Sequence, residues 1–425
     1  MQVINYPTPE QYATIIQRPV MDFEEIEQRV RPIMEAVKTR GDEALREYSL
    51  QFDKVAIRDI RVTPEELEQA ESQLTPELKE AIQVAYQNIE TFHRVQKEAV
   101  QKVETMEGVT CWRKSVAIQK VGLYIPGGTA PLFSTVLMLG IPAKLAGCEE
   151  LVLCTPPNAQ GQIHPAILFT ANLIGIQKVY KVGGAQAIAA MTFGTESISK
   201  VYKIFGPGNQ YVTAAKQLAT KEGVAIDMPA GPSEVAVLAD RSARPAFIAA
   251  DLLSQAEHGV DSQVLLITDH PPLVEDVQKE VESQLAQLPR KEIAVKALEN
   301  SRMVLTKTMD KALELVNEYA AEHLIIATDN ADELADSIYN AGSVFLGHYT
   351  PESAGDYASG TNHTLPTYGF ARNYSGVSLD SFIKKVTFQK ITKAGIEKLG
   401  PYVEEMAAAE QLDAHKNAVT VRIKE

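Results

Sequence analysis

The spacing of apolar residues divides the chain into a helical first part and a longer part with a different pattern. In the first hundred residues, apolar side chains recur every three or four positions at 23–37 and again at 78–92, which is the period of an amphipathic helix. The stretches TPEE at 63–66 and TPEL at 75–78 place threonine, proline and glutamate in the order typical of helix starts. We therefore expect a helix to begin at each of them.

From about residue 116, short β-branched runs alternate with helical segments. The runs lie at 121–125, 151–154, 179–182, 201–205, 224–226, 234–239, 263–268, 323–328 and 343–347. Apolar runs separated by helices indicate parallel sheets that are covered on both faces. These runs are too many for one small sheet, so the pattern predicts two α/β lobes.

The stretch 351–376, PESAGDYASGTNHTLPTYGFARNYSG, breaks this alternation. It contains no valine or isoleucine, but it has four glycines and several aromatic residues. A long stretch without apolar periodicity in a compact protein is functional or disordered, and the aromatic residues argue against disorder. We expect an ordered loop at a functional site, followed by a return to helix from about residue 378.

Composition narrows the class of protein. The 425 residues are 45% hydrophobic and 23% charged, which is ordinary for a soluble globular protein, and the length allows two or more domains. A net charge of −14 argues against a nucleic-acid partner. The chain shows no signal peptide and no apolar run long enough for a bilayer. Its three cysteines suggest no disulfide framework, so we expect a cytoplasmic protein without a membrane partner.

Several predicted strands end in glycine-rich turns, namely YIPGG, KVGGAQ and IFGPGNQY. Such a turn between a strand and a helix lets a phosphate approach the backbone. None of the three has the G-x-G-x-x-G spacing of the standard dinucleotide fingerprint. Taken singly, each turn is more simply explained as a tight connection between a strand and a helix.

Two short stretches could carry chemistry. In LLSQAEHGV at 252–260, Gln255 and His258 would share one helix face and could bind a metal ion together. The simpler interpretation is a helix end, with His258 in the last turn and Gly259 as its left-handed cap. In AAEHL, Glu322 and His323 offer two proton acceptors at the start of a strand, although an ordinary helix end would look the same.

Other candidates are more isolated. His363 lies in GTNHT, and Glu410 and His415 lie five positions apart in the tail. Cys154 ends a predicted strand and could act as a covalent nucleophile. Because cysteine is among the most buried residue types, we favour a small core residue at this position.

Taken together and in order, these motifs resemble the histidinol dehydrogenase family over essentially the whole chain. The matching stretches are GGAQAIAAM, GPGNQYVTAAK, IDMPAGPSEVAVLAD, LLSQAEHG, AAEHL, PESAGDYASGTNHTLPTYG and LDAHKNAV. The resemblance implies a zinc-dependent enzyme that oxidises L-histidinol through L-histidinal to L-histidine. It also implies the use of NAD twice, in the last step of histidine biosynthesis.

The resemblance assigns roles to residues of this chain. It implies one zinc ion per subunit, bound by Gln255, His258, Asp356 and His415. The implied catalytic pair is Glu322 and His323. The implied substrate contacts are Ser233, Gln255, His258, His323, Asp356, His363, Glu410 and His415. The implied NAD contacts are Tyr124, Gln186 and Asn209.

The resemblance also implies an architecture. We expect two lobes with incomplete Rossmann-like parallel sheets, similar to aldehyde dehydrogenases, and small helical segments at both ends that embrace a partner in an intertwined homodimer with shared active sites. The expected division is a segment at 1–20, a first lobe at 21–127 and 231–377, an inserted second lobe at 128–230, and a dimerisation segment at 378–425.

The sequence leaves open two alternative functions and one alternative mechanism. One is a zinc hydrolase that uses Glu322 as its base and does not need NAD. Another is a metal-dependent small-molecule binding protein without enzymatic activity. A third keeps the oxidation but routes it through a covalent intermediate on Cys154.

Overall fold

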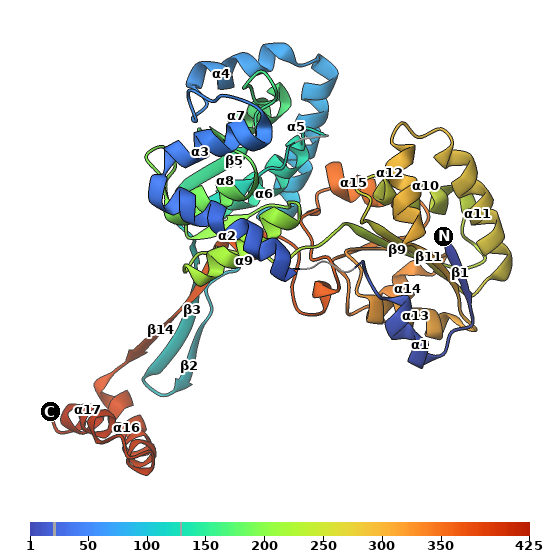
Figure 1. Ribbon diagram of the computed structural model, residues 1–425. Helices are drawn as coiled ribbons and strands as arrows, with labels where there is room; N and C mark the ends of the chain where they lie inside the picture. The colour runs from blue at the N-terminus through green and yellow to red at the C-terminus, as the bar shows by residue number, and fades with distance from the viewer. Residues whose placement is uncertain (20–22, 128–129) are drawn as a thin grey trace.

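The computed structural model describes residues 1–19, 23–127 and 130–425, and it has two α/β lobes and a projecting arm (Figure 1). The five-stranded lobe contains β4 (Lys120–Tyr124), β5 (Glu150–Thr155), β6 (Lys178–Lys181), β7 (Lys203–Phe205) and β8 (Ala225–Ile226). Its strands are parallel and lie in the order β6–β5–β4–β7–β8.

Helices cover both faces of this sheet, as the apolar strand runs predict. One face packs against α2 (Phe23–Arg40), α3 (Asp42–Tyr48), α8 (Gly184–Phe193) and α9 (Gln210–Lys221). The other face packs against α4 (Pro64–Gln69), α5 (Pro76–Arg94), α6 (Phe133–Ala146) and α7 (Pro165–Ile174). The two expected helix starts are confirmed, because Thr63 and Thr75 cap α4 and α5 with their side chains.

The six-stranded lobe has the same plan with one extra edge strand. Its strands are β1 (Gln2–Asn5), β9 (Glu234–Ala239), β10 (Gln263–Thr268), β11 (Arg302–Leu305), β12 (His323–Ala327) and β13 (Ser343–Leu346), all parallel, in the order β1–β11–β10–β9–β12–β13. One face carries α10 (Pro245–Ala256), α11 (Pro271–Leu285) and α12 (Lys291–Glu299). The other carries α1 (Pro9–Ile15), α13 (Met309–Tyr319) and α14 (Ala331–Ala335).

In both sheets the first strand of the α/β unit lies in the centre, and the chain then adds strands on one side before it crosses to the other. This is the doubly wound order, and each sheet is an incomplete Rossmann-like unit. The predicted fold class, two α/β lobes with parallel sheets, is therefore confirmed. The crossing points, between β4 and β7 and between β9 and β12, are where such folds leave a crevice at the strand ends.

The arm is built from antiparallel strands that the sequence pattern did not predict. They are β2 (Lys102–Met106), β3 (Val109–Ala117) and β14 (Ile383–Ile391), and they lead to α16 (Lys393–Ala409) and α17 (Asp413–Ile423) at the far end of the molecule (Figure 1). The expectation of helix from residue 378 onward is correct only for the last part. The three strands are largely exposed and rich in polar residues, so they lack the continuous apolar run of a buried strand. Within the described part of the chain, no helix combines the length and apolar character needed to cross a membrane.

The packing of the core differs from the expected division of the chain. Apolar residues between Ile26 and Ile89 pack on the five-stranded sheet rather than on the six-stranded sheet, and Val377 and Ala358 of the segment 231–377 join the same core. The N-terminal residues instead belong to the six-stranded lobe, where β1 extends the sheet and Tyr12 and Ile15 enter its core. The sequence of an amphipathic helix does not show which sheet the helix covers. For this reason the expected division placed 21–127 with 231–377, whereas its helices cover the five-stranded sheet.

This packing predicts that a core substitution in α3 destabilises the five-stranded lobe and leaves the six-stranded lobe unchanged. Leu45 is 1% exposed in the core beneath α2 and α3, so Leu45→Ala should cost about 2–5 kcal/mol of unfolding free energy. Hydrogen exchange should then quicken in β4–β7. As a control, Leu253→Ala in α10 should quicken exchange in β9 and β10 instead. Loss of protection in β9 and β12 on Leu45→Ala would contradict this division of the core.

Candidate active site between the two lobes

A pocket of about 530 Å³ lies where the two lobes meet. The five-stranded lobe lines it with the turn that follows β7, including Asn209, and the six-stranded lobe lines it with Ser233, His258, Glu322 and His363. Asn209 comes from the carboxyl side of a strand, whereas Ser233 and Glu322 directly precede β9 and β12. The carboxyl end of one sheet therefore faces the amino end of the other across the pocket.

Gln255 and His258 come from the end of α10, and the local geometry differs from the expectation. The helix ends at Ala256, so His258 lies beyond its last turn, and Gly259 does not adopt the left-handed conformation of a cap. His258 is exposed to the pocket, and its Nδ1 lies 3.5 Å from Ser233 Oγ. Gln255 is fully buried and donates from Nε2 to the carbonyl oxygen of Glu234 at 3.3 Å.

Glu322 and His323 meet Gln255 at the start of β12. His323 Nδ1 lies 2.9 Å from Gln255 Nε2 and 3.2 Å from the carbonyl oxygen of Glu234. On the other side of the ring, His323 Nε2 lies 3.2 Å from Asp356 Oδ1. Glu322 accepts a hydrogen bond through Oε2 from the backbone N–H of Glu234 at 2.9 Å. His323 of the proposed catalytic pair is thus in direct contact with two of the proposed metal ligands.

The electrostatics of this group follow from burial and from mutual proximity. Burial raises the pKa of Glu322 to about 8. Burial would also disfavour a charge on His323, but the carboxylates of Glu322, Asp356 and Glu352 outweigh it and raise the pKa of the ring to about 10. Although burial would raise the pKa of Asp356, its contact with His323 holds that pKa below its usual value. Strongly shifted groups gathered at a pocket are typical of an active site.

Asp356 and His363 come from the polar stretch 351–376, which is ordered as expected. The stretch forms a short helix, α15 (Glu352–Tyr357), followed by irregular chain. His363 donates from Nδ1 to the carbonyl oxygen of Asp356 at 2.8 Å, and its Nε2 lies 3.1 Å from Thr135 Oγ1 on α6. The stretch therefore connects the six-stranded lobe to the five-stranded lobe beside the pocket.

The donor set fits a metal ion, although one chain does not complete it. Gln255 Oε1 is buried and has no hydrogen-bond partner among the described residues, which is costly unless a ligand binds it. An amide oxygen with one imidazole and one carboxylate suits zinc. Among residues 1–19, 23–127 and 130–425, however, no three His, Cys, Asp or Glu side chains are grouped with the spacing of a metal site. His258 and Asp356 supply only two such groups.

Glu410 and His415 are not brought to this pocket by their own chain. Glu410 follows α16 and His415 lies in α17, and both side chains are exposed at the end of the arm, away from the two lobes (Figure 1). The structure therefore gathers Ser233, Gln255, His258, Glu322, His323, Asp356 and His363, and it leaves the two C-terminal residues apart.

The proposed NAD contacts lie at the carboxyl end of the five-stranded sheet. Tyr124, the last residue of β4, accepts a hydrogen bond at its hydroxyl from the backbone N–H of Gly184 at 3.0 Å. A Cβ on Gly184 would lie 2.7 Å from Gln186 Oε1, which places Gln186 at the same helix start. Asn209 caps α9 by accepting from two backbone N–H groups, each at 3.1 Å. Gly206 has a φ of 130°, and a Cβ there would meet the carbonyl oxygen of Tyr124 at 2.0 Å, so only glycine fits this turn.

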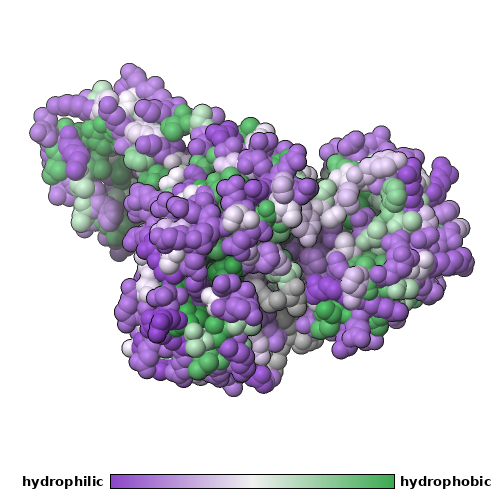
Figure 2. All heavy atoms as spheres, turned by 90° about the horizontal axis from the view of Figure 1, so that it is seen from above, coloured by the Kyte–Doolittle hydropathy of each residue, from purple (hydrophilic) through white to green (hydrophobic). Residues whose placement is uncertain are grey.

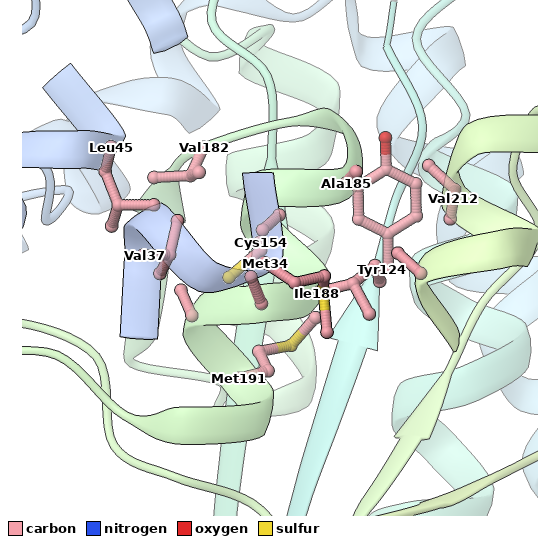
Figure 3. Packing of buried hydrophobic residues seen from close by; sticks show 14 of the residues in the cluster. Met34, Val37, Leu45, Tyr124, Cys154, Val182, Ala185, Ile188, Met191 and Val212 are labelled. Atoms are coloured by element: carbon pink, nitrogen blue, oxygen red, sulfur yellow. The ribbon is translucent and has the colours of Figure 1, made fainter. Parts of the chain in front are cut away.

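Cys154 is a core residue, as we favoured. It is fully buried in the same apolar cluster as Met34, Val182 and Ile188, shown in Figure 3. Burial raises the pKa of its thiol far above the ordinary value, so the thiolate required for nucleophilic attack is disfavoured. This placement argues against the covalent alternative.

Three residues that the sequence analysis did not select support the site. The backbone of Glu234 contacts Glu322, His323 and Gln255. The carboxylate of Glu234 forms an ion pair with Arg18. Glu352 is buried behind Asp356, accepts from Ser254 Oγ at 2.8 Å, and has its pKa raised to about 8 by burial. A charged residue inside the apolar run EVAVLA was the available signal for Glu234, because such a residue is rarely buried without a partner.

Comparisons with known proteins show the family of this chain. The sequence model of the histidinol dehydrogenase family matches residues 16–423. The chain belongs to the histidinol dehydrogenase family. It is 64% identical to the histidinol dehydrogenase of Bacteroides thetaiotaomicron, over 100% of this chain and 99% of that protein. It is 54% identical to that of Escherichia coli K12, over 99% and 96%.

A solved structure gives the same result for the fold. The crystal structure of histidinol dehydrogenase from Elizabethkingia anophelis superimposes with a TM-score of 0.98 at 58% sequence identity, and the match covers 100% of this chain and 98% of that one. The resemblance found in the sequence is therefore confirmed. With it, the prediction of an enzyme, an oxidoreductase of the dehydrogenase type, is confirmed as well.

Proposed function

We propose that this chain catalyses the NAD-linked, four-electron oxidation of L-histidinol through L-histidinal to L-histidine. The observation that carries the proposal is the contact of Gln255, His323 and Asp356 beside the pocket, where Gln255 Oε1 has no hydrogen-bond partner within the described part of the chain. Groups able to accept a proton or to bind a metal ion thus lie together, between the carboxyl end of a sheet suited to a dinucleotide and a pocket large enough for a small substrate, and this supports the proposal. The histidinol dehydrogenases of 54–64% identity support this substrate.

Gln255, His258 and Asp356 would hold a zinc ion, one per subunit, with His415 as the fourth protein ligand. When bound, zinc would orient the imidazole and amine of the substrate and polarise its oxygen. The buried Gln255 Oε1, which gains a partner in this way, supports the assignment. Ser233, His363 and Glu410 would complete the contacts to histidinol.

The two residues at the start of β12 would divide the proton chemistry. A cation bound at Gln255 Oε1 and Asp356 would offset the carboxylates that raise the pKa of His323. The neutral ring would then take the hydroxyl proton of histidinol as the hydride leaves its carbon, which gives the aldehyde. Glu322 would take a proton from the water that adds to the aldehyde, and the hydrate would then lose a second hydride and a proton to give the acid. The hydrogen bond from the Glu234 N–H to Glu322 Oε2 leaves the other carboxyl oxygen for this water.

Tyr124, Gln186 and Asn209 would bind NAD, which supplies the acceptor for the hydride in each step. Their common place at the carboxyl end of the five-stranded sheet, near the crossing point between β4 and β7, is where doubly wound folds bind nucleotides. The backbone N–H groups of the glycine-rich turns there suit the pyrophosphate.

A second copy of this chain would complete each site. The arm exposes apolar side chains, including Val103, Phe388, Tyr402 and Met406, and a hollow of about 880 Å³ lies on it beside Trp112. Figure 2 shows green hydrophobic atoms on this part of the molecule, at the left. Apolar surface of this kind is typical of an interface. A homodimer joined through the arm would bring Glu410 and His415 of one chain to the ligands of the other.

The reaction itself is tested by counting NADH. Histidinol with excess NAD should give two NADH per histidinol, because the alcohol is oxidised to the acid. Chelation should abolish this turnover and zinc should restore it. A zinc hydrolase or a binding protein predicts no NADH, and full activity in metal-free protein would contradict the metal assignment.

The division of labour in the catalytic pair is tested with the aldehyde. Glu322→Gln should slow the oxidation of supplied histidinal by about 10²-fold or more, because the amide cannot accept the proton of water. The first hydride transfer from histidinol, followed in a single turnover, should fall much less. His323→Asn should slow the first hydride transfer from histidinol more than the oxidation of supplied histidinal. Wild-type histidinal oxidation in Glu322→Gln would remove Glu322 from this role.

The shared site is tested by mixing two inactive variants. Chains with His258→Asn and chains with His415→Asn are unfolded and refolded together, which gives about half heterodimers. In each heterodimer one site combines both lesions and the other has neither, so about a quarter of the wild-type activity should return. No recovery with heterodimers demonstrably present would show that His415 acts within its own chain.

A further inference from the structure

We propose that Arg18 and Glu234 form a positioning pair that holds Glu322 and His323 in their reactive arrangement. The inference rests on the catalytic roles proposed above for those two residues. It concerns an ion pair whose two residues are not among the described residues that line the pocket.

Glu234 connects this ion pair to the site through its own backbone. Its N–H donates to Glu322 Oε2, and its carbonyl oxygen accepts from Gln255 Nε2 and lies 3.2 Å from His323 Nδ1. A shift of the Glu234 backbone would therefore move the partners of three site residues together.

The β9–β12 ladder alone does not hold Glu234 and Glu322 in register. It begins at Val235 and His323, so Glu234 and Glu322 lie one residue outside it, although Glu234 still pairs with Gln263 of β10. The turn that leads into Glu322 also contains Ala320 with a φ of 53°, a left-handed conformation that alanine rarely adopts. The link between the two strand starts therefore depends on side-chain hydrogen bonds such as that from the Glu234 N–H to Glu322 Oε2.

Arg18 supports both of these strand starts. Its guanidinium binds Glu234 with two parallel hydrogen bonds, Nε to Oε1 at 2.5 Å and an Nη to Oε2 at 2.9 Å. The same group donates to the carbonyl oxygen of Tyr319 at 2.7 Å and stacks over the Tyr319 ring at 4.2 Å, at the end of α13 just before Glu322. The backbone N–H of Tyr368 donates to Glu234 Oε1 at 2.8 Å and completes the carboxylate's environment.

The Arg18–Glu234 ion pair contributes more to the geometry of the site than to the stability of the fold. The side chains of Arg18 and Glu234 are 8% and 2% exposed, and desolvation offsets much of the attraction in so dry an ion pair. The bidentate fork, in contrast, fixes the direction of the carboxylate as well as its distance. Lysine would keep the charge but would lose the fork and the simultaneous bond to Tyr319.

The test compares substitutions at Arg18 with a matched arginine. Arg302 also anchors the N-terminal segment, by donating to the carbonyl oxygens of Ile15 and Gln17, but no contact joins it to Glu234 among the described residues. We expect Arg18→Met to lower kcat by about 10- to 100-fold with the KM for histidinol within about threefold, because a displacement of about 1 Å at the reacting groups costs rate rather than binding. Arg18→Lys should recover part of this loss. Arg302→Met should lower the melting temperature while kcat stays within about twofold.

The results with these variants test the positioning role, and a failure of that role can be distinguished from a failure of the proposed reaction. A wild-type kcat in folded Arg18→Met would overturn the positioning role, and so would an equal loss of kcat in Arg302→Met, because anchoring of the segment would then explain it. If Arg18→Met does not fold, Arg18→Lys decides: an unchanged kcat overturns the role, and a lowered kcat at constant KM supports it. Wild-type protein that forms no NADH from histidinol would instead overturn the proposed function.

Discussion

The opposed orientation of the two sheets is the constraint on which the rest of the site depends. The five-stranded sheet presents the carboxyl ends of its strands to the pocket, where glycine-rich turns and helix starts offer backbone N–H groups. The six-stranded sheet presents its amino ends, so Glu234 and His323 stand at the first positions of β9 and β12. A surface suited to an anionic dinucleotide thus faces a surface that carries carboxylates and imidazoles.

This arrangement concentrates ionisable groups where water is scarce. Glu322, His323, Glu352 and Asp356 come from two separate segments, yet each has a pKa that is shifted by burial or by another member of the group. Their protonation is therefore a property of the cluster and not of any one residue. A cation bound at Gln255 Oε1, which lacks a hydrogen-bond partner among the residues that the structure describes, would change the balance of charge in this cluster.

Sequence patterns predicted the buried elements well and the exposed ones poorly. The runs at 234–239 and 263–268 coincide with β9 and β10, and the two Thr-Pro-Glu starts cap α4 and α5. Strands β2, β3 and β14 were missed because they are exposed and rich in polar residues, so no apolar run signals them. The helices between Ile26 and Ile89 were recognised, but the sheet beneath them was not, since an apolar stripe fits either lobe.

By itself, the sequence determined the family, the fold class and the residue types of the site, because long motifs such as GPSEVAVLAD and LLSQAEHG are specific as strings of letters. Only the tertiary structure brought Arg18 and Glu234 into contact beside the proposed catalytic pair, and placed Glu410 and His415 away from that pair in their own chain. Arg18 and Glu234 are 216 positions apart, and an ion pair over such a separation leaves no local periodicity to read. The spacing of residues along a chain reports its own helix or strand face, whereas contacts between elements are set by how the sheets pack.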